Sequence, residues 1–83
     1  MQITLKCFAF LGQYLPPGTH GNTLQIEVAQ GLSIVDLLDQ LNIDHDMVEL
    51  AILNDQFIDT MQREQTILQP GDTLALWPEV AGG

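Results

Sequence analysis

One amphipathic helix, set between segments with the alternation of β-strands, constrains this chain more than any other feature. Ser33 is a typical helix N-cap, and Asp36 follows it close to the spacing of a capping box. The apolar residues after the cap recur at helical spacing and form one stripe: Ile34, Leu37, Leu38 and Leu41. The pattern predicts a helix from Ile34 to Leu41 or Asn42. A helix with one apolar face must bury that face, and the strand segments on either side can supply a sheet.

Two strands are predicted before this helix. Residues 2–10 alternate with period two and place one set of side chains inward: Ile3, Leu5, Cys7 and Ala9. Residues 23–29 alternate in the same way and are expected to pair with the first strand as a hairpin. Residues 11–22 contain Pro16, Pro17 and three glycines, which predicts a loop between the two strands.

The segment after the helix returns to strand and turn signals. Its pattern predicts, in order, a strand over 48–54, a turn at Asn54-Asp55, a short strand over 56–59, a turn over 69–72 and a strand over 73–78. Proline has no backbone N–H to donate, so strand pairing is expected to end near Pro78.

This order of elements predicts a single α+β domain in which a mixed sheet of four to five strands packs on one helix. The simplest layout is the β-grasp, with the first and last strands adjacent and parallel. Residues 1–78 are expected to form this domain, and residues 79–83 a flexible C-terminal tail that ends in Gly-Gly.

The charge balance excludes several classes of partner. Eleven acidic residues face two basic ones among 83 residues, and the formal net charge is −9. Such a chain repels phosphate backbones and anionic lipid, so we expect no nucleic-acid or membrane role. An acidic surface favours basic partner proteins, or it serves only solubility. The single cysteine and the absence of a recognisable targeting segment lead us to expect a cytoplasmic protein.

Catalytic motifs are scarce in the sequence. His20 and His45 fall in separate predicted loops, and Cys7 is expected to be buried. Asp44 and Asp46 flank His45, but a solvated loop is the favoured interpretation of this cluster, and we expect no metal site. Phosphate-binding glycine motifs are absent from the sequence. We therefore expect that the chain is not an autonomous enzyme and binds no cofactor.

The C-terminal residues carry a different kind of chemistry. Five residues follow Pro78 and can extend about 17 Å at most. Gly82 and Gly83 have no side chains, so they can enter a channel barely wider than a backbone. The Gly83 carboxylate is consequently the least hindered acyl group of the protein. It becomes an electrophile only after activation, for example as an acyl-adenylate.

The longest motif is QPGDTLALWPEVAGG at residues 69–83, an apolar strand that leads into Pro78-x-Val80-x-Gly-Gly. Further motifs are the Phe8-Ala9 pair, the helix SIVDLLDQL at 33–41 and AILND at 51–55. Over essentially its whole length the chain resembles the ubiquitin-like sulfur carriers, which include the small subunit of molybdopterin synthase and the thiamine-pathway sulfur carrier protein. Molybdopterin-type members typically end in Phe-Pro-Pro-Val-x-Gly-Gly. Trp77 and Glu79 depart from that pattern, and Asp55 stands at a turn position that is commonly glycine.

The resemblance implies that the chain is a protein co-substrate. A ubiquitin-activating-like enzyme would use ATP to adenylate the Gly83 carboxylate, and a sulfur donor would convert it to a thiocarboxylate. The carrier would then insert its tail into a larger synthase subunit, or another acceptor enzyme, and donate sulfur. Gly82 would provide clearance beside the reacting carbon. The tail pattern favours molybdopterin (molybdenum or tungsten cofactor) biosynthesis.

Three alternatives stay open from the sequence. The sulfur could serve thiamine or another thiocarboxylate pathway. The chain could be a ubiquitin-like modifier that joins Gly83 to lysines of target proteins. It could also be a β-grasp interaction domain whose terminal glycines are idle. The sequence does not identify the sulfur donor or the acceptor, or decide between a monomer and a stable complex.

The strand registers also suggest a docking surface. Phe8, Phe10 and Trp77 are predicted to share the sheet face opposite the helix, beside the tail. An exposed apolar patch of this size usually marks a partner surface. We therefore expect Phe8, Phe10 and Trp77 to contact partners together with Pro78, Val80 and Ala81 of the tail. The alternative is that the loop over 11–22 covers part of this face, Phe10 first.

Overall fold

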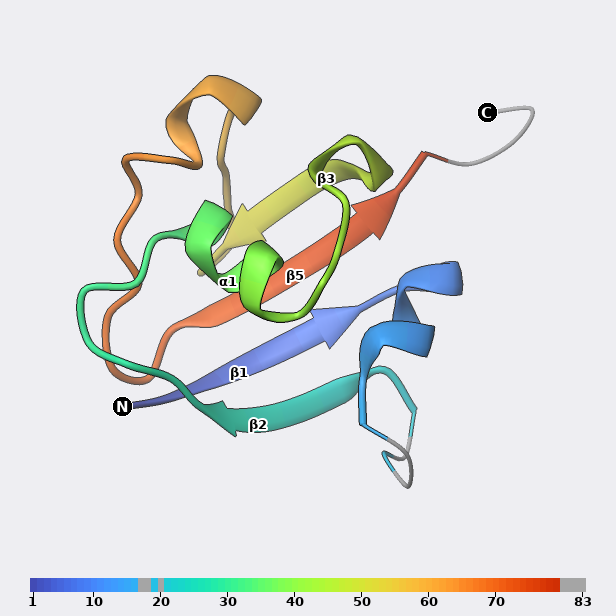
Figure 1. The fold of residues 1–83 in the computed structure, drawn as a ribbon, viewed down its shortest axis with the longest axis horizontal. Helices are drawn as coiled ribbons and strands as arrows, with labels where there is room; N and C mark the ends of the chain where they lie inside the picture. The colour runs from blue at the N-terminus through green and yellow to red at the C-terminus, as the bar shows by residue number, and fades with distance from the viewer. Residues whose placement is uncertain (17–18, 20, 80–83) are drawn as a thin grey trace.

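The structure is a computed structural model that describes residues 1–16, 19 and 21–79. In this part of the chain, five strands form one mixed sheet in the order β2-β1-β5-β3-β4. The strands are β1 (Gln2–Cys7), β2 (Thr23–Glu27), β3 (Val48–Leu53), β4 (Gln56–Phe57) and β5 (Thr73–Pro78). The helix is α1 (Ile34–Gln40), and three 3-10 turns are η1 (Ala9–Tyr14), η2 (His45–Met47) and η3 (Thr60–Gln62). Figure 1 shows β5 running through the centre of this sheet.

The sheet topology confirms the predicted β-grasp. β1 and β5 are parallel neighbours, with Lys6 opposite Ala75 and Cys7 opposite Leu76. The pairs β1–β2, β3–β4 and β3–β5 are antiparallel. The last strand therefore lies beside the first and parallel to it, as predicted, and its other neighbour is β3.

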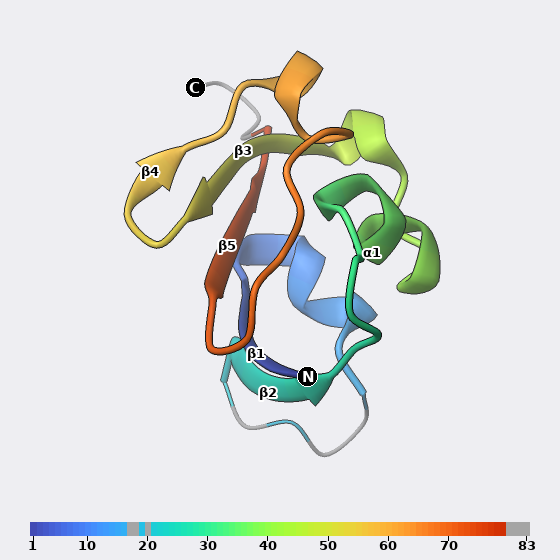
Figure 2. The ribbon, with the colours of Figure 1, turned by 90° about the vertical axis from the view of Figure 1, so that its left-hand side faces the viewer.

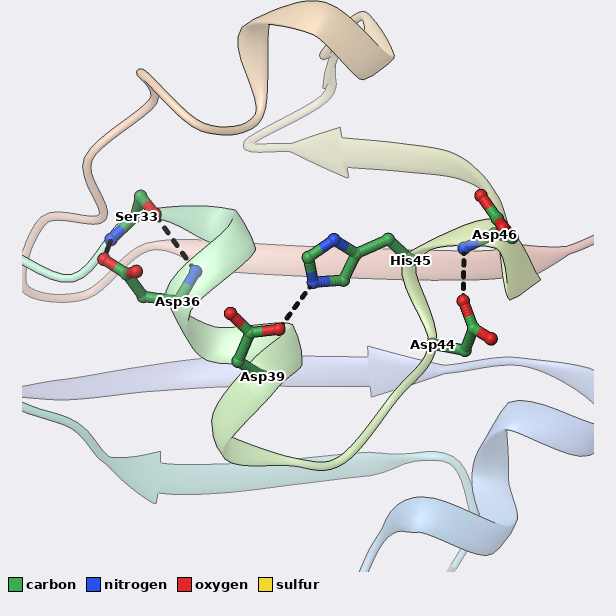
Figure 3. A network of polar contacts seen from close by, with 6 residues as sticks. All are labelled: Ser33, Asp36, Asp39, Asp44, His45 and Asp46. Atoms are coloured by element: carbon green, nitrogen blue, oxygen red, sulfur yellow. Dashed lines mark hydrogen bonds and ion pairs between the residues drawn. The ribbon is translucent and has the colours of Figure 1, made fainter.

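The local signals at α1 are also confirmed. The Asp36 N–H donates to Ser33 Oγ at 3.0 Å, and the Ser33 N–H donates to Asp36 Oδ2 at 3.1 Å, which completes a capping box (Figure 3). The helix ends at Gln40, slightly before the predicted end, and Asn42 then adopts a φ of 60°. The described helices include none with the length and hydropathy of a membrane span.

The core lies between one face of the sheet and α1, which Figure 2 shows on one side of the strands. Its most deeply buried members are Ile3, Leu5, Cys7, Leu11, Ile34, Leu37, Leu38, Ala51, Leu68, Leu74 and Leu76. The inward set predicted from the alternation of residues 2–7 is thus correct. Since α1 covers only this face, the opposite face of the sheet keeps its side chains available.

The first strand is shorter than predicted. β1 ends at Cys7, and residues 9–14 form η1, although the alternation had continued to Phe10. Ala9 has a φ of 51° and is exposed, so its predicted inward position is wrong. The turn lets the Leu11 N–H donate to the Phe8 carbonyl at 3.1 Å and buries the Leu11 side chain completely. Burial of this leucine outweighs one more residue of strand pairing.

Candidate functional site

The end of β5 places the base of the C-terminal tail. Pro78 is buried and is paired with Val48 of β3, and Glu79 after it is exposed. The predicted end of pairing at Pro78 is therefore correct. The four residues beyond Glu79, which include the predicted partner contacts Val80 and Ala81 and the predicted reactive pair Gly82 and Gly83, lie outside the described residues.

Two of the three predicted docking aromatics meet beside this point. The rings of Phe8 and Trp77 lie parallel, with centroids 4.3 Å apart and planes inclined by 5°. The Phe8 N–H also donates to the carbonyl of Leu76 at 3.0 Å, which holds the end of β1 against β5. Stacked aromatic pairs stabilise beyond the area they bury. Both side chains stay partly exposed, so the stack is reachable from solvent.

Phe10 does not extend this surface as a strand residue. It lies in η1, because β1 has already ended, and its side chain is 47% exposed. The prediction that all three aromatics share one strand face is wrong for Phe10, for the same reason that β1 is short. Within the described part of the chain, the segment over 11–22 leaves about half of the Phe10 side chain exposed, so the expected covering of Phe10 is not seen there.

An open groove of about 490 Å³ lies on the sheet face opposite α1. Its lining comes from β1, β3, β5 and the turn after β3: Lys6, Phe8, Ile52, Asn54, Asp55, Thr73, Ala75 and Trp77. The strand registers place Lys6 next to Ala75, and Ala75 next to Ile52, so these three form one row across the sheet. The Phe8–Trp77 stack forms one wall of the groove.

Sequence reasoning missed the contribution of β3 and β4 to this face. Leu50 pairs with Trp77 and is 40% exposed, whereas Phe57 pairs with Ile52 and is 59% exposed. The signal was present in the alternation, because Leu50 and Ile52 flank the fully buried Ala51. Together with the stack they form a continuous apolar band, which we call the outer band: Phe8, Leu50, Ile52, Phe57, Ala75 and Trp77.

The turn between β3 and β4 fixes the other wall of the groove. Asn54 and Asp55 have φ values of 49° and 69°, the signature of a two-residue type I′ hairpin. Asn54 Nδ2 donates to Asp72 Oδ1 at 2.8 Å, and Asn54 Oδ1 accepts from the Thr73 N–H at 2.9 Å. These bonds attach the turn to the start of β5 and hold Asp55 at the rim.

Among the described residues outside the groove, two features involve side chains of types used in catalysis, the Cys7 thiol and the contacts around His45. Burial raises the pKa of the Cys7 thiol from 9.0 to about 11, so the thiolate needed for nucleophilic attack is suppressed. His45 Nε2 lies 2.7 Å from Asp39 Oδ1, and Asp44 Oδ1 accepts from the Asp46 N–H (Figure 3). Among the described residues, no group of three or more His, Cys, Asp or Glu side chains could hold a metal ion.

Arg63 is a buried cation that the sequence did not predict, since residues 60–66 showed only a weak polar pattern. Its side chain is 2% exposed and donates from Nη1 to the Val48 carbonyl at 2.9 Å and from Nη2 to the Glu49 carbonyl at 3.3 Å. Burial lowers the pKa of the guanidinium, and the carboxylates of Glu49 and Asp59 oppose that shift. Arg63 thereby holds the start of β3, the strand that pairs with Pro78.

Comparisons with known proteins agree with this geometry. The model of the ThiS family matches residues 17–83, which is most of the chain. A search of the curated proteins finds no match to the sequence.

Solved structures match the fold over 95% or more of the chain. SAMP1 from Haloferax volcanii has a TM-score of 0.67 at 21% identity, covering 100% of both chains. A putative molybdopterin converting factor subunit 1 from Pyrococcus furiosus has a TM-score of 0.66 at 19% identity, covering 95% of this chain and 98% of its own. In a complex of subunits 1 and 2 of the molybdopterin-converting factor from Helicobacter pylori, the matching chain has a TM-score of 0.59 at 24% identity, covering 100% of both. By its family match this chain belongs to the ThiS family, and its fold agrees with these solved structures.

Proposed function

We propose that the chain is a sulfur-carrier protein whose Gly83 carboxylate is adenylated and converted to a thiocarboxylate. In this role it is the small, non-catalytic subunit of a molybdopterin synthase and works in the cytoplasm. The chain binds no cofactor, and ATP is consumed by the activating partner. The protein supplies a reactive terminus and a recognition surface, and its partners supply the acid, base and metal chemistry.

The observation that carries this proposal is the burial of Pro78 at the end of the central strand. Pro78 is paired with Val48, and Arg63 holds the carbonyl of Val48. The last five residues therefore leave from a rigid point of the domain. They can reach about 17 Å, which lets Gly83 enter a partner's active site while the folded domain docks outside.

The chemistry follows from a terminus without side chains. A Gly83 carboxylate oxygen attacks the α-phosphorus of ATP, and pyrophosphate leaves. A persulfide sulfur then attacks the acyl carbon, and AMP leaves. A second thiol cleaves the remaining S–S bond and frees the thiocarboxylate. Gly82 keeps the approach to this carbon open because it carries no Cβ.

The domain contributes recognition. The Phe8–Trp77 stack lies at the base of the tail and borders the groove, so a partner that threads the tail also meets these rings. Pro78, Val80 and Ala81 are the expected contacts along the tail itself. Phe10 is exposed nearby in η1 and is retained as a peripheral contact.

Two observations support the molybdopterin branch over the thiamine branch. The tail has the Pro78-x-Val80-x-Gly-Gly pattern, and two structural relatives are described as subunits of a molybdopterin-converting factor. The relative from Helicobacter pylori was solved together with subunit 2, which supports a larger partner subunit for this chain as well.

A second candidate function is protein modification. The relative from Haloferax volcanii is named SAMP1, a small archaeal modifier protein, and it shares the fold over both full chains. A modifier would use the same activation, after which a lysine ε-amine attacks the Gly83 acyl carbon and AMP leaves. The same tail and the same outer surface serve both functions.

The deciding experiment measures the intact mass of the protein after incubation with a candidate activating enzyme, ATP and a persulfide donor. We expect the mass change of one oxygen replaced by sulfur, and no change in a variant that lacks Gly83. Adenylate formation followed by attachment to other proteins would favour the modifier. Full activity in the absence of Gly83 would refute both functions.

A further inference from the structure

Lys6 is partly exposed, and it stands out as the Lys or Arg side chain that solvent reaches in an otherwise acidic chain. The sequence has only one other such residue, Arg63, and that guanidinium is buried against β3. The terminal amine is also occupied, since it donates to the Val28 carbonyl at 2.7 Å and lies 3.3 Å from a Glu27 carboxylate oxygen. Among the described residues Lys6 forms no ion pair.

The position of Lys6 places this charge inside the groove. Lys6 lies opposite Ala75 and lines the groove together with the Phe8–Trp77 stack. The outer band continues from there over β5 and β3 to Phe57 on β4. A single cation therefore borders an apolar surface that crosses three further strands.

The opposite side of the groove carries the opposite charge. Asp55 lies at the turn between β3 and β4, where Asn54 is held by Asp72 and Thr73. Lys6 is on β1, so β5 and β3 with Ala75 and Ile52 separate the two charges. The groove thus has a positive side, a floor of Ala75, Ile52 and Thr73, and a negative side.

We propose that this groove binds the adenylating partner through a surface that presents a carboxylate to Lys6 and a basic side chain to Asp55, on either side of an apolar centre. The inference deepens the proposed function, on which it rests, by assigning the two residues that orient the carrier. Docked in reverse, the partner would set like charges against each other, which disfavours the wrong orientation. The correct orientation directs the base of the tail at Pro78 toward the partner's active site.

Charge also argues against a second copy of this chain as the occupant. Each copy carries a net charge of −9, so two outer bands would meet under mutual repulsion. A partner with a basic rim is attracted to the acidic domain, and its one carboxylate then selects the Lys6 side of the groove.

The test compares charge changes matched in size and placed on different faces. Lys6→Gln and Gln40→Glu both change the net charge by one unit in the acidic direction, but Gln40 is exposed on α1, away from the groove. Asp55→Asn and Glu64→Gln both change the net charge by one unit in the basic direction, and the exposed Glu64 is the control position. Asparagine at position 55 can adopt the positive φ that the turn requires. The dissociation constant for the activating enzyme is measured by titration, and adenylation by ATP–pyrophosphate exchange.

We expect Lys6→Gln and Asp55→Asn each to weaken binding about tenfold, and the matched variants to change it by less than about twofold. If the Lys6→Gln variant binds as tightly as the Gln40→Glu variant while the wild type is adenylated normally, the orientation proposal is overturned and the carrier function stays intact. A wild type that neither binds nor becomes adenylated with any activating enzyme would overturn both. Sedimentation of the protein alone tests for a second copy as the occupant. A dimer of the wild type that becomes a monomer in Lys6→Gln would identify that second copy and overturn the assignment to the adenylating partner.

Discussion

The guanidinium of Arg63 donates to the carbonyl of Val48 at 2.9 Å, from a side chain that is 2% exposed. Val48 is the residue that pairs with Pro78 at the base of the tail. Arg63 therefore connects the irregular segment after β4 to the point where the tail leaves the sheet. Its Nε atom has no partner among the described residues, so the stabilising bonds are those from the two terminal nitrogens.

Removal of this guanidinium should destabilise the domain strongly. Arg63→Met leaves the carbonyls of Val48 and Glu49 without their donor, and we expect the free energy of unfolding to fall by about 2–4 kcal/mol. Urea unfolding followed by circular dichroism measures it. Glu64→Gln, at an exposed neighbour, is the control and should stay within about 0.5 kcal/mol of wild type. An equally small change for Arg63→Met would show that the two carbonyls find other donors.

The buried thiol of Cys7 predicts a loss of stability at alkaline pH. Its pKa is 9.0 when unfolded and about 11 when folded, so the folded state favours the neutral thiol. The stabilisation is complete below the unfolded pKa and is lost as pH rises from 9.0 to about 11. Between about pH 8 and about pH 10.5, wild type should lose roughly 1–2 kcal/mol more than Cys7→Ala. Parallel pH profiles of the two proteins would contradict this account.

The Phe8–Trp77 stack predicts how substitutions of Trp77 change the affinity for partner proteins. Trp77→Ala removes the ring next to the tail, and we expect affinity for the activating or acceptor partner to drop about tenfold or more. Trp77→Phe keeps a stacked ring and should cost less than about threefold. Unchanged affinity of Trp77→Ala for every partner, with an intact fold, would rule out docking at the stack. Phe8→Leu should shift the emission of Trp77, the single tryptophan, by exposing its ring face.

The turn at Asn54-Asp55 predicts opposite effects for two substitutions. Asp55 has a φ of 69°, which glycine adopts without steric cost and valine does not. Asp55→Gly should therefore keep or raise the free energy of unfolding, by up to about 1 kcal/mol, and Asp55→Val should lower it by about 1–2 kcal/mol. Thermal unfolding of the two variants beside wild type measures the difference. Equal melting temperatures would mean that the turn relaxes to another conformation.

Local signals in the sequence predicted most of the fold. The capping box at Ser33 and Asp36 involves neighbours in the chain, so it could be recognised without tertiary information. The alternation of Ile3, Leu5 and Cys7 likewise predicted their burial, and the turn at Asn54-Asp55 predicted the boundary between β3 and β4.

The errors occurred where distant segments compete for the same residues. Alternation alone extended the first strand to Phe10, but the core offered Leu11 a buried position that only a turn at Ala9 could reach. The burial of Arg63 was equally hidden, because its acceptors are backbone carbonyls of β3, fifteen and fourteen positions earlier. A carbonyl has no residue-specific signature in a sequence.

The sequence by itself determined the five strands, the helix and their order, because hydrophobic period, capping and turn chemistry act between near neighbours. Only the tertiary structure decided which faces meet. It placed Phe8 flat against Trp77, set Lys6 and Asp55 on opposite sides of one groove, and left every residue of the outer band except Ala75 at least partly exposed. Those relationships depend on strand register between β1, β5 and β3, and register is set by the packing of the whole domain.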